Sequence, residues 1–172
     1  VPSGGVRFSA VAGIGASAIA VGDDGVVART SDRGETWAVR VVALGVGLSD
    51  VALPTTAVGY AVGQGGLVLR TMDGGVTWAV LPLPSDASLT GVDFTDAESG
   101  WVVGDAGTVF RTSDGGSHWE RVSVETTAAL TDVAVTSRRV VVTGNDGTIT
   151  VFPTVGEDAP LVGAPEPVTF TF

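Results

Sequence analysis

Short runs of apolar residues, separated by turns rich in glycine and aspartate, recur along the whole chain. Segments such as GYAVG at 59–63 and GWVVG at 100–104 lead into a tight turn and then a second apolar run, the pattern of a β-hairpin. Many runs carry apolar residues at successive positions, as in VVV at 140–142, which indicates strands buried on both faces. No window follows the helical period, so the pattern predicts an all-β fold.

These elements repeat with a period of 41 residues. The octapeptide TSDRGETW at 30–37 recurs as TMDGGVTW at 71–78 and as TSDGGSHW at 112–119, and matching first strands begin at Phe8, Leu48, Leu89 and Leu130. A period of about 40 residues is typical of solenoids and propellers. Four strands per unit, stacked as sheets around an axis, would bury both faces of each sheet. We therefore predict a β-propeller of four-stranded antiparallel blades, with four blades in this chain.

The repeat divides one propeller domain, residues 1–172, into blades at approximately 6–45, 46–86, 87–127 and 128–172. We expect the last blade to take its third strand from Thr148–Phe152 and its fourth from VTFTF at 168–172. Four blades could close alone, join a second chain as a homodimer, or form part of a larger ring. An incomplete ring would expose the apolar faces of its end blades, which favours association.

Each octapeptide lies where the third strand of a unit turns into the fourth. An aspartate there can accept hydrogen bonds from its own turn, and a glycine two residues later can take the positive φ of a tight reversal. The tryptophan offers a large apolar area that can close the gap between neighbouring sheets. We predict a structural role for the following residues: Thr30, Asp32, Gly34, Thr36, Trp37, Thr71, Asp73, Gly75, Thr77, Trp78, Thr112, Asp114, Gly116 and Trp119.

The octapeptide pattern Ser/Thr-x-Asp-x-Gly-x-Thr-Trp is known as the Asp-box, or BNR repeat. The stretch GWVVGDAGTVFRTSDGGSHW at 100–119 resembles the repeats of Ycf48-like (HCF136-type) propellers, which are associated with photosystem II assembly. The resemblance covers about residues 6–152 and departs from the pattern at His118, where threonine is expected, and after Phe152, where no Asp-box follows. It implies that the Asp-boxes are structural and lie on the face away from the usual ligand site.

Charge and composition restrict the possible partners. The chain has nine basic residues, all arginine, and 19 acidic residues, which gives a formal net charge of -10. This charge would repel a phosphate backbone, so we expect no nucleic-acid partner. No apolar run approaches the roughly 20 residues that span a bilayer, so we expect no membrane insertion. With no cysteine and one histidine, the chain lacks the parts of a cysteine zinc site or a serine-type triad. We expect no cofactor.

Acids in the turns between second and third strands could form a cation site. Their oxygens are the ligands that calcium prefers, although hairpin turns require the same residue types for their own geometry, and we favour that explanation. The weak metal candidates are Asp23, Asp24, Asp105 and Asp146.

Arginines precede each Asp-box, at Arg29, Arg70 and Arg111. Three guanidinium groups could together bind a ligand carboxylate, as in sialidases. Because the repeat spaces them evenly around the ring, we expect them instead to pair with blade acids such as Asp50, Asp93 or Asp132.

The predicted function is a non-enzymatic propeller scaffold for protein–protein interaction or complex assembly, Ycf48-like by resemblance, with a protein partner. The alternative is a carbohydrate-binding or sialidase-like glycoside hydrolase propeller. A sialidase needs a tyrosine nucleophile with carboxylate partners. The single tyrosine, Tyr60, lies at a repeated strand position that Trp101 also occupies, so we do not expect glycoside cleavage.

Overall fold

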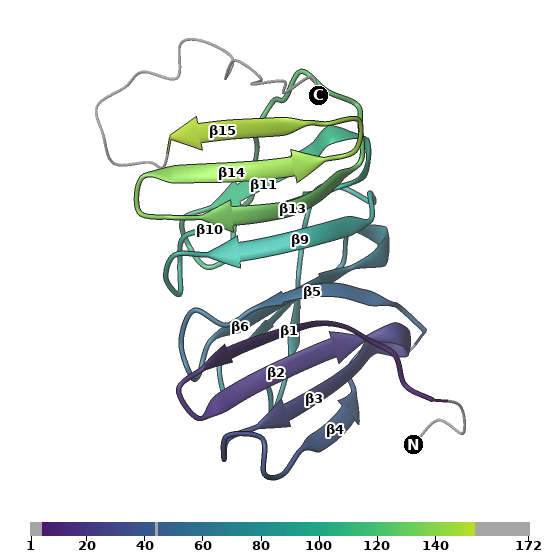
Figure 1. Ribbon diagram of the computed structural model, residues 1–172, viewed down its shortest axis with the longest axis vertical. Coiled ribbons are helices and arrows are strands. Elements are labelled where there is room, and N and C mark those ends of the chain that lie inside the picture. Colours follow the sequence, from purple (N-terminus) through teal and green to yellow (C-terminus); the bar gives the residue numbers. More distant parts are fainter. Residues whose placement is uncertain (1–4, 44, 154–172) are drawn as a thin grey trace.

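The computed structural model describes residues 5–43 and 45–153. Their strands form four antiparallel sheets, each built from one continuous segment, which follow one another along the long axis of the molecule (Figure 1). We call these sheets the first to fourth blades. The first three have four strands in sequential order, and the fourth has three within the described residues, because the predicted last strand, VTFTF, lies outside them. The predicted all-β fold of antiparallel blades is confirmed.

The bounds of the strands follow the repeat. The first blade contains β1 (Phe8–Ile14), β2 (Ser17–Gly22), β3 (Val26–Thr30) and β4 (Ala38–Val41). The second contains β5 (Leu48–Ala52), β6 (Gly59–Gly63), β7 (Val68–Thr71) and β8 (Ala79–Leu81). The third contains β9 (Leu89–Phe94), β10 (Gly100–Gly104), β11 (Thr108–Thr112) and β12 (Glu120–Arg121). The fourth contains β13 (Leu130–Val135), β14 (Arg139–Gly144) and β15 (Ile149–Pro153).

Short 3₁₀ turns join the second and third strands of the first three blades: η1 (Asp23–Gly25), η2 (Gln64–Gly66) and η3 (Asp105–Gly107). The last residue of each turn is a glycine with positive φ that packs against the chain leaving the same blade. At Gly107, with φ of +66°, an added Cβ would lie 2.1 Å from the carbonyl oxygen of Thr126, so only glycine fits there. Across residues 5–43 and 45–153, no helix has the length and apolar character to span a bilayer.

The hydrophobic core lies between the blades rather than inside any one of them. Alternate side chains of each sheet face the preceding and the following blade, which explains the runs of successive apolar residues. Between the second and third blades, for example, Val62 and Val68 pack with Leu89, Val102 and Phe110. Similar clusters join the first blade to the second and the third to the fourth. Each blade therefore depends on its neighbours for burial of its apolar faces.

The first strands of successive blades lie side by side along the front of the view in Figure 1. Two acids link them: Asp50 Oδ2 accepts a hydrogen bond from Val92 N at 2.8 Å, and Asp93 Oδ2 accepts one from Val135 N at 2.7 Å. Burial is the main cause that raises the pKa of both carboxyl groups. These side chains therefore join neighbouring blades through the backbone.

Candidate functional site

The three Asp-boxes adopt one hydrogen-bonded geometry. In the second box, Thr71 Oγ1 donates to Asp73 Oδ1 at 2.9 Å and accepts from Gly75 N at 2.8 Å. Asp73 Oδ1 also accepts from Thr77 N at 2.8 Å, and Asp73 Oδ2 accepts from Thr77 Oγ1 at 2.6 Å. The first box repeats these contacts with Thr30, Asp32, Gly34 and Thr36. The aspartate therefore ties both ends of its turn together.

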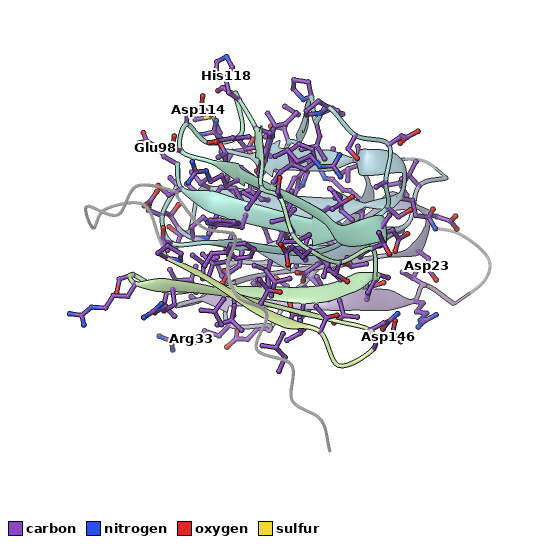
Figure 2. The ribbon with its side chains drawn as sticks, turned by 90° about the horizontal axis from the view of Figure 1, so that it is seen from above. Asp23, Arg33, Glu98, Asp114, His118 and Asp146 are labelled. Carbon is purple, nitrogen blue, oxygen red and sulfur yellow. The ribbon has the colours of Figure 1, made fainter. Side chains whose placement is uncertain are left out.

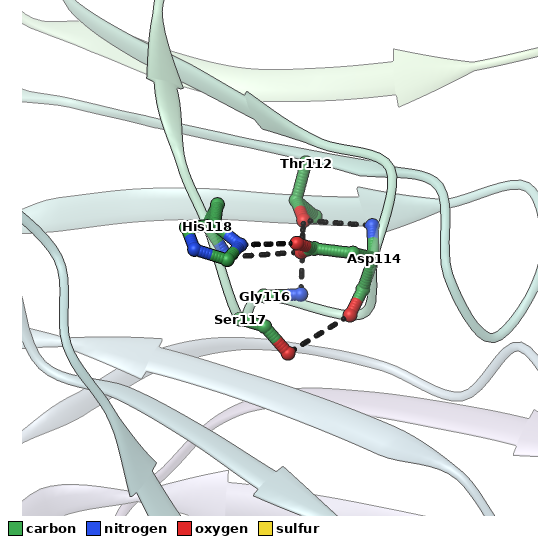
Figure 3. A network of polar contacts seen from close by, with 5 residues as sticks. All are labelled: Thr112, Asp114, Gly116, Ser117 and His118. Carbon is green, nitrogen blue, oxygen red and sulfur yellow. Dashed lines mark hydrogen bonds and ion pairs between the residues drawn. The ribbon is translucent and has the colours of Figure 1, made fainter.

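The third box keeps this geometry with histidine in place of threonine (Figure 3). His118 N donates to Asp114 Oδ1 at 2.9 Å, and His118 Nδ1 lies 2.6 Å from Asp114 Oδ2. Thr112 Oγ1 donates to Asp114 at 2.9 Å and accepts from Gly116 N at 2.9 Å, as in the other boxes. The imidazole thus takes the place of the threonine hydroxyl.

Hydrogen bonds to the carboxylates lower the pKa of all three box aspartates to about 2. The largest cause is the Thr30 hydroxyl for Asp32, the Thr77 hydroxyl for Asp73, and the backbone N–H of His118 for Asp114. Because the hydrogen bonds favour the charged form, the aspartates are ionised at neutral pH and cannot serve as proton donors.

The tryptophans of the boxes differ in burial. Trp78 packs against the cluster between the first and second blades, and Trp119 against the cluster between the second and third. Trp37 is 44% exposed. It belongs to the first blade, and no described blade covers the corresponding side of that sheet (Figure 1).

Within residues 5–43 and 45–153, none of the arginines that precede the boxes forms an ion pair with Asp50, Asp93 or Asp132, so the expectation was wrong for these acids, although Arg111 does pair with another acid of its blade. Asp50 and Asp93 accept backbone N–H groups of the next blade instead. Arg111 pairs with Glu120, and the Arg70 guanidinium lies 5.8 Å from the ring centroid of Tyr60. A carboxylate whose oxygens already accept backbone hydrogen bonds has fewer free lone pairs with which to bind an arginine.

The turn acids lie at the end of the strands opposite the Asp-boxes. Figure 2 shows Asp23 and Asp146 on one side and Asp114 and His118 on the other. Asp24 and Asp146 have positive φ, and Asp105 begins η3, so these residues serve the turn geometry itself. No group of three or more possible metal-ligating side chains is present among the residues that the structure describes. A cation site at Asp23, Asp24, Asp105 and Asp146 gains no support from this arrangement.

A pocket of about 570 Å³ opens between the third and fourth blades, at the Asp-box end of the strands. Its walls come from Trp101 of β10, Arg111 of β11, the third Asp-box, and the loops at 95–99 and 135–137. It lies on the face opposite the one that the family resemblance suggests for a ligand.

The pocket occupies a place that an Asp-box fills at the other blade interfaces. An added Cβ on Gly75 would lie 2.9 Å from Ile19 Cδ1 of the preceding blade, and one on Gly115 would lie 3.1 Å from the Arg70 guanidinium. The strand register makes Trp101 the counterpart of Ile19, and Phe152 the counterpart of the box threonine Thr112. Phe152 stacks on Trp101 at this interface, with ring centroids 5.4 Å apart.

The groups that line the pocket are suited to a polar ligand with an apolar part. Tyr60, the counterpart of Trp101, donates its hydroxyl to Ala97 O at 2.7 Å, and Trp101 lines the pocket with its indole. Glu120 Oε2 accepts from Arg111 Nε at 2.9 Å and from Nη2 at 2.7 Å. Backbone hydrogen bonds, chiefly from Glu98, lower the pKa of Asp96. The pocket thus offers an indole, a paired guanidinium and ionised carboxylates.

Sequence reasoning did not find this pocket. Its one signal in the sequence is the departure from the Asp-box pattern after Phe152. The loops that complete the walls carry no motif, so their convergence depends on the packing of two blades.

Comparisons with known proteins place the chain among propellers. A family model described as photosynthesis system II assembly factor YCF48 matches residues 41–129 and 76–156, together more than half of the chain. A solved structure of YCF48 bound to a D1 peptide is 22% identical with a TM-score of 0.76, covering 95% of this chain and 55% of that one. YCF48 from Cyanidioschyzon merolae is 19% identical with a TM-score of 0.75, covering 100% of this chain and 59% of that one.

A more distant fold neighbour is an enzyme. The structure of an ancestral GH74 enzyme is 16% identical with a TM-score of 0.69, covering 88% of this chain and 23% of that one. No curated protein sequence is significantly similar to the chain. The chain spans little more than half the length of the two YCF48 structures, and at these identities the structures establish the propeller fold alone. On the strength of the family match over most of its length, this chain belongs to the photosystem II assembly factor YCF48 family.

Proposed function

We propose that this chain is a non-enzymatic propeller scaffold that binds a polypeptide in the pocket between the third and fourth blades. The observation that carries the proposal is the match to the YCF48 assembly-factor family. A YCF48 structure with the same fold binds a D1 peptide, so the experiment below uses a D1 peptide as its probe. Assembly of photosystem II is the process to which this binding would contribute.

The pocket supports the proposal because at the other interfaces its position holds a polypeptide turn. The turns at Gly75 and Gly115 show that the surface around Ile19 and Arg70 accepts backbone in van der Waals contact. A peptide from a partner can use the counterpart surface at Trp101 and Arg111. Such contacts resemble those within a blade interface.

The same pocket offers little support for hydrolysis. Glycosidases require a carboxylic acid that is protonated at working pH, usually with a raised pKa, opposite a second carboxylate. Asp96 and Asp114 have lowered pKa values, so neither can act as that acid at neutral pH. Arg111 holds the third acid of the pocket, Glu120, in an ion pair. These observations favour binding over catalysis.

The proposal is tested by titrating a fluorescently labelled D1 peptide with the purified chain and following anisotropy. Arg111→Gln should weaken binding about tenfold or more, because it removes the guanidinium and releases Glu120. Arg29→Gln is the matched control, since it changes the same repeat position at an interface where the Gly75 turn packs. It should leave the affinity unchanged.

Two results would overturn the proposal. Equal affinity of Arg111→Gln and the unchanged chain, together with a loss in Asp105→Asn on the opposite face, would move the peptide site away from the pocket. Release of sugar from a fluorogenic glycoside, abolished by Glu120→Gln, would contradict the non-enzymatic role.

A further inference from the structure

The loop at residues 95–99 forms one wall of the pocket and is fixed in part by its own blade. Three polar residues of the loop line the pocket: Thr95, Asp96 and Ser99. Asp96 Oδ1 accepts hydrogen bonds from Glu98 N at 2.7 Å and from Ser99 N at 2.8 Å. Glu98 O accepts a hydrogen bond from Gly115 N of the third Asp-box at 2.9 Å. Figure 2 shows Glu98 on the same side of the molecule as Asp114 of that box.

The third blade adds a second hold on this loop that comes from its neighbour. The bond between box and loop recurs in the first two blades, from Arg33 N to Ala16 O and from Gly74 N to Ala57 O. At the third blade, the hydroxyl of Tyr60 also donates to Ala97 O at 2.7 Å. Tyr60 belongs to β6 of the second blade, so this bond crosses the interface between two blades.

Tyr60 lies behind the pocket wall and contacts the loop in two ways. It is 0% exposed, and its ring stacks on Phe94 with centroids 3.6 Å apart and planes at 4°. Phe94 is the last residue of β9, directly before the loop. Burial raises the pKa of Tyr60, so its hydroxyl stays protonated and able to donate at neutral pH. Ring and hydroxyl together hold the start and the middle of the loop.

Arg70, the cross-strand neighbour of Tyr60, supports the other part of the wall. Its guanidinium carbon lies 5.8 Å from the ring centroid of Tyr60. The turn of the third Asp-box packs on the same guanidinium, since an added Cβ on Gly115 would lie 3.1 Å from it. The second blade thus contacts both elements of the third blade that line the pocket, the loop and the box.

The repeat indicates that folding alone does not require this hydroxyl. The strand register makes Ile19 the counterpart of Tyr60 in the first blade. The side chain of Ile19 has no polar atom, yet it is 1% exposed and belongs to the cluster that joins the first two blades. An apolar residue therefore satisfies the packing at this position, and the hydroxyl adds the bond to the loop.

We propose that Tyr60 is a positioning residue for the peptide site, because its hydroxyl holds the loop at 95–99 in the conformation that the peptide binds. The inference rests on the proposed binding of a peptide in this pocket. When the loop is loosened, only part of the population is competent to bind, and the apparent affinity falls by that fraction. The loss appears in the association rate constant, while the bound peptide dissociates as before.

The test compares Tyr60→Phe with the unchanged chain, using the fluorescently labelled D1 peptide. This substitution removes the hydroxyl and keeps the ring that stacks on Phe94. It should weaken binding about fivefold, and stopped-flow anisotropy should show the change in the association rate constant. Ile19→Val is the matched control, since it removes one carbon from the counterpart position and lowers stability at an interface away from the pocket. It should leave both rate constants unchanged.

Amide hydrogen exchange tests the loop without any peptide. In Tyr60→Phe, the amides of Glu98, Ser99 and Gly115 should exchange about fivefold faster, because the loop that they bond opens more often. The amide of Gly74 is the internal control, since it makes the equivalent bond in the second blade. Its exchange should not change, and a general loss of stability would raise it together with the others.

Three results would overturn the proposal. One is unchanged exchange of the Glu98 and Ser99 amides in Tyr60→Phe. Another is an equal loss of affinity in Tyr60→Phe and Ile19→Val, which would show an effect of stability alone. The third is faster dissociation with an unchanged association rate. If the unchanged chain binds no D1 peptide, the proposed function fails, and the exchange data decide whether Tyr60 holds the loop.

Discussion

Truncation of Leu89 to alanine should destabilise the whole chain, because this side chain lies in the interface between two blades. Leu89 is 0% exposed and belongs to the cluster that joins the second and third blades. If blades depend on one another for burial, the loss at one interface will lower the stability of the cooperative fold, not just that of one sheet.

The magnitude follows from the removed atoms and the cavity that they leave. Leucine to alanine removes three carbons, worth about 0.8 kcal/mol each on transfer, or about 2.4 kcal/mol. A cavity in a closely packed interface adds about 1–2 kcal/mol, since the surrounding strands cannot collapse fully. We expect a loss of about 3–4 kcal/mol in the free energy of unfolding. For a chain of this length that corresponds to a decrease of about 10 °C in Tm.

The assay is urea unfolding followed by tryptophan fluorescence, with calorimetry for the Tm, at one protein concentration because association would shift the midpoint. Val80→Ala serves as the control: its side chain is exposed, and the change should stay within about 0.5 kcal/mol. A loss below about 1 kcal/mol for Leu89→Ala would refute the reasoning. So would two separate transitions, since these would show that the blades unfold independently.

Three further outcomes test the local chemistry. Asp73→Ala should lower the Tm, measured by calorimetry, because its turn loses four acceptor contacts, yet it should leave peptide affinity unchanged. Acidification from pH 5 to 2 should remove the stabilisation that the box aspartates supply: the pKa values of Asp32, Asp73 and Asp114 are about 2 in the fold and near 3.8 when unfolded, so their contribution is present above 3.8 and is lost as the pH falls towards 2. In a pH series of urea midpoints, Asp73→Asn should show a shallower loss. Gly107→Ala should cost about 2 kcal/mol or more, because its positive φ and the Thr126 carbonyl exclude a methyl group, and an unchanged urea midpoint would contradict this.

The repeat in the sequence was sufficient to predict the blades, because every level of the pattern agreed. The spacing of the tryptophans, the apolar runs and the glycine turns all indicated the same unit, and such consistency leaves few alternative folds. His118 shows why one departure from the motif did not change the outcome, since its backbone N–H and ring nitrogen contact Asp114 as threonine contacts Asp73.

The pairing of the arginines could not be predicted in this way. The expectation that these arginines pair with Asp50 or Asp93 assumed that both carboxylates were available. Asp50 and Asp93 instead accept N–H groups of the next blade, a contact that depends on how the first strands lie beside each other. The pocket was missed for the same reason: it needs Phe152 on Trp101 and two loops from different blades.

The most direct test of the account is a crystal structure of the chain with a bound D1 peptide. We predict peptide density between the third and fourth blades at the Asp-box end, in contact with Trp101 and Arg111. Peptide bound at the opposite end, beside the turns of Asp23 and Asp105, would contradict it.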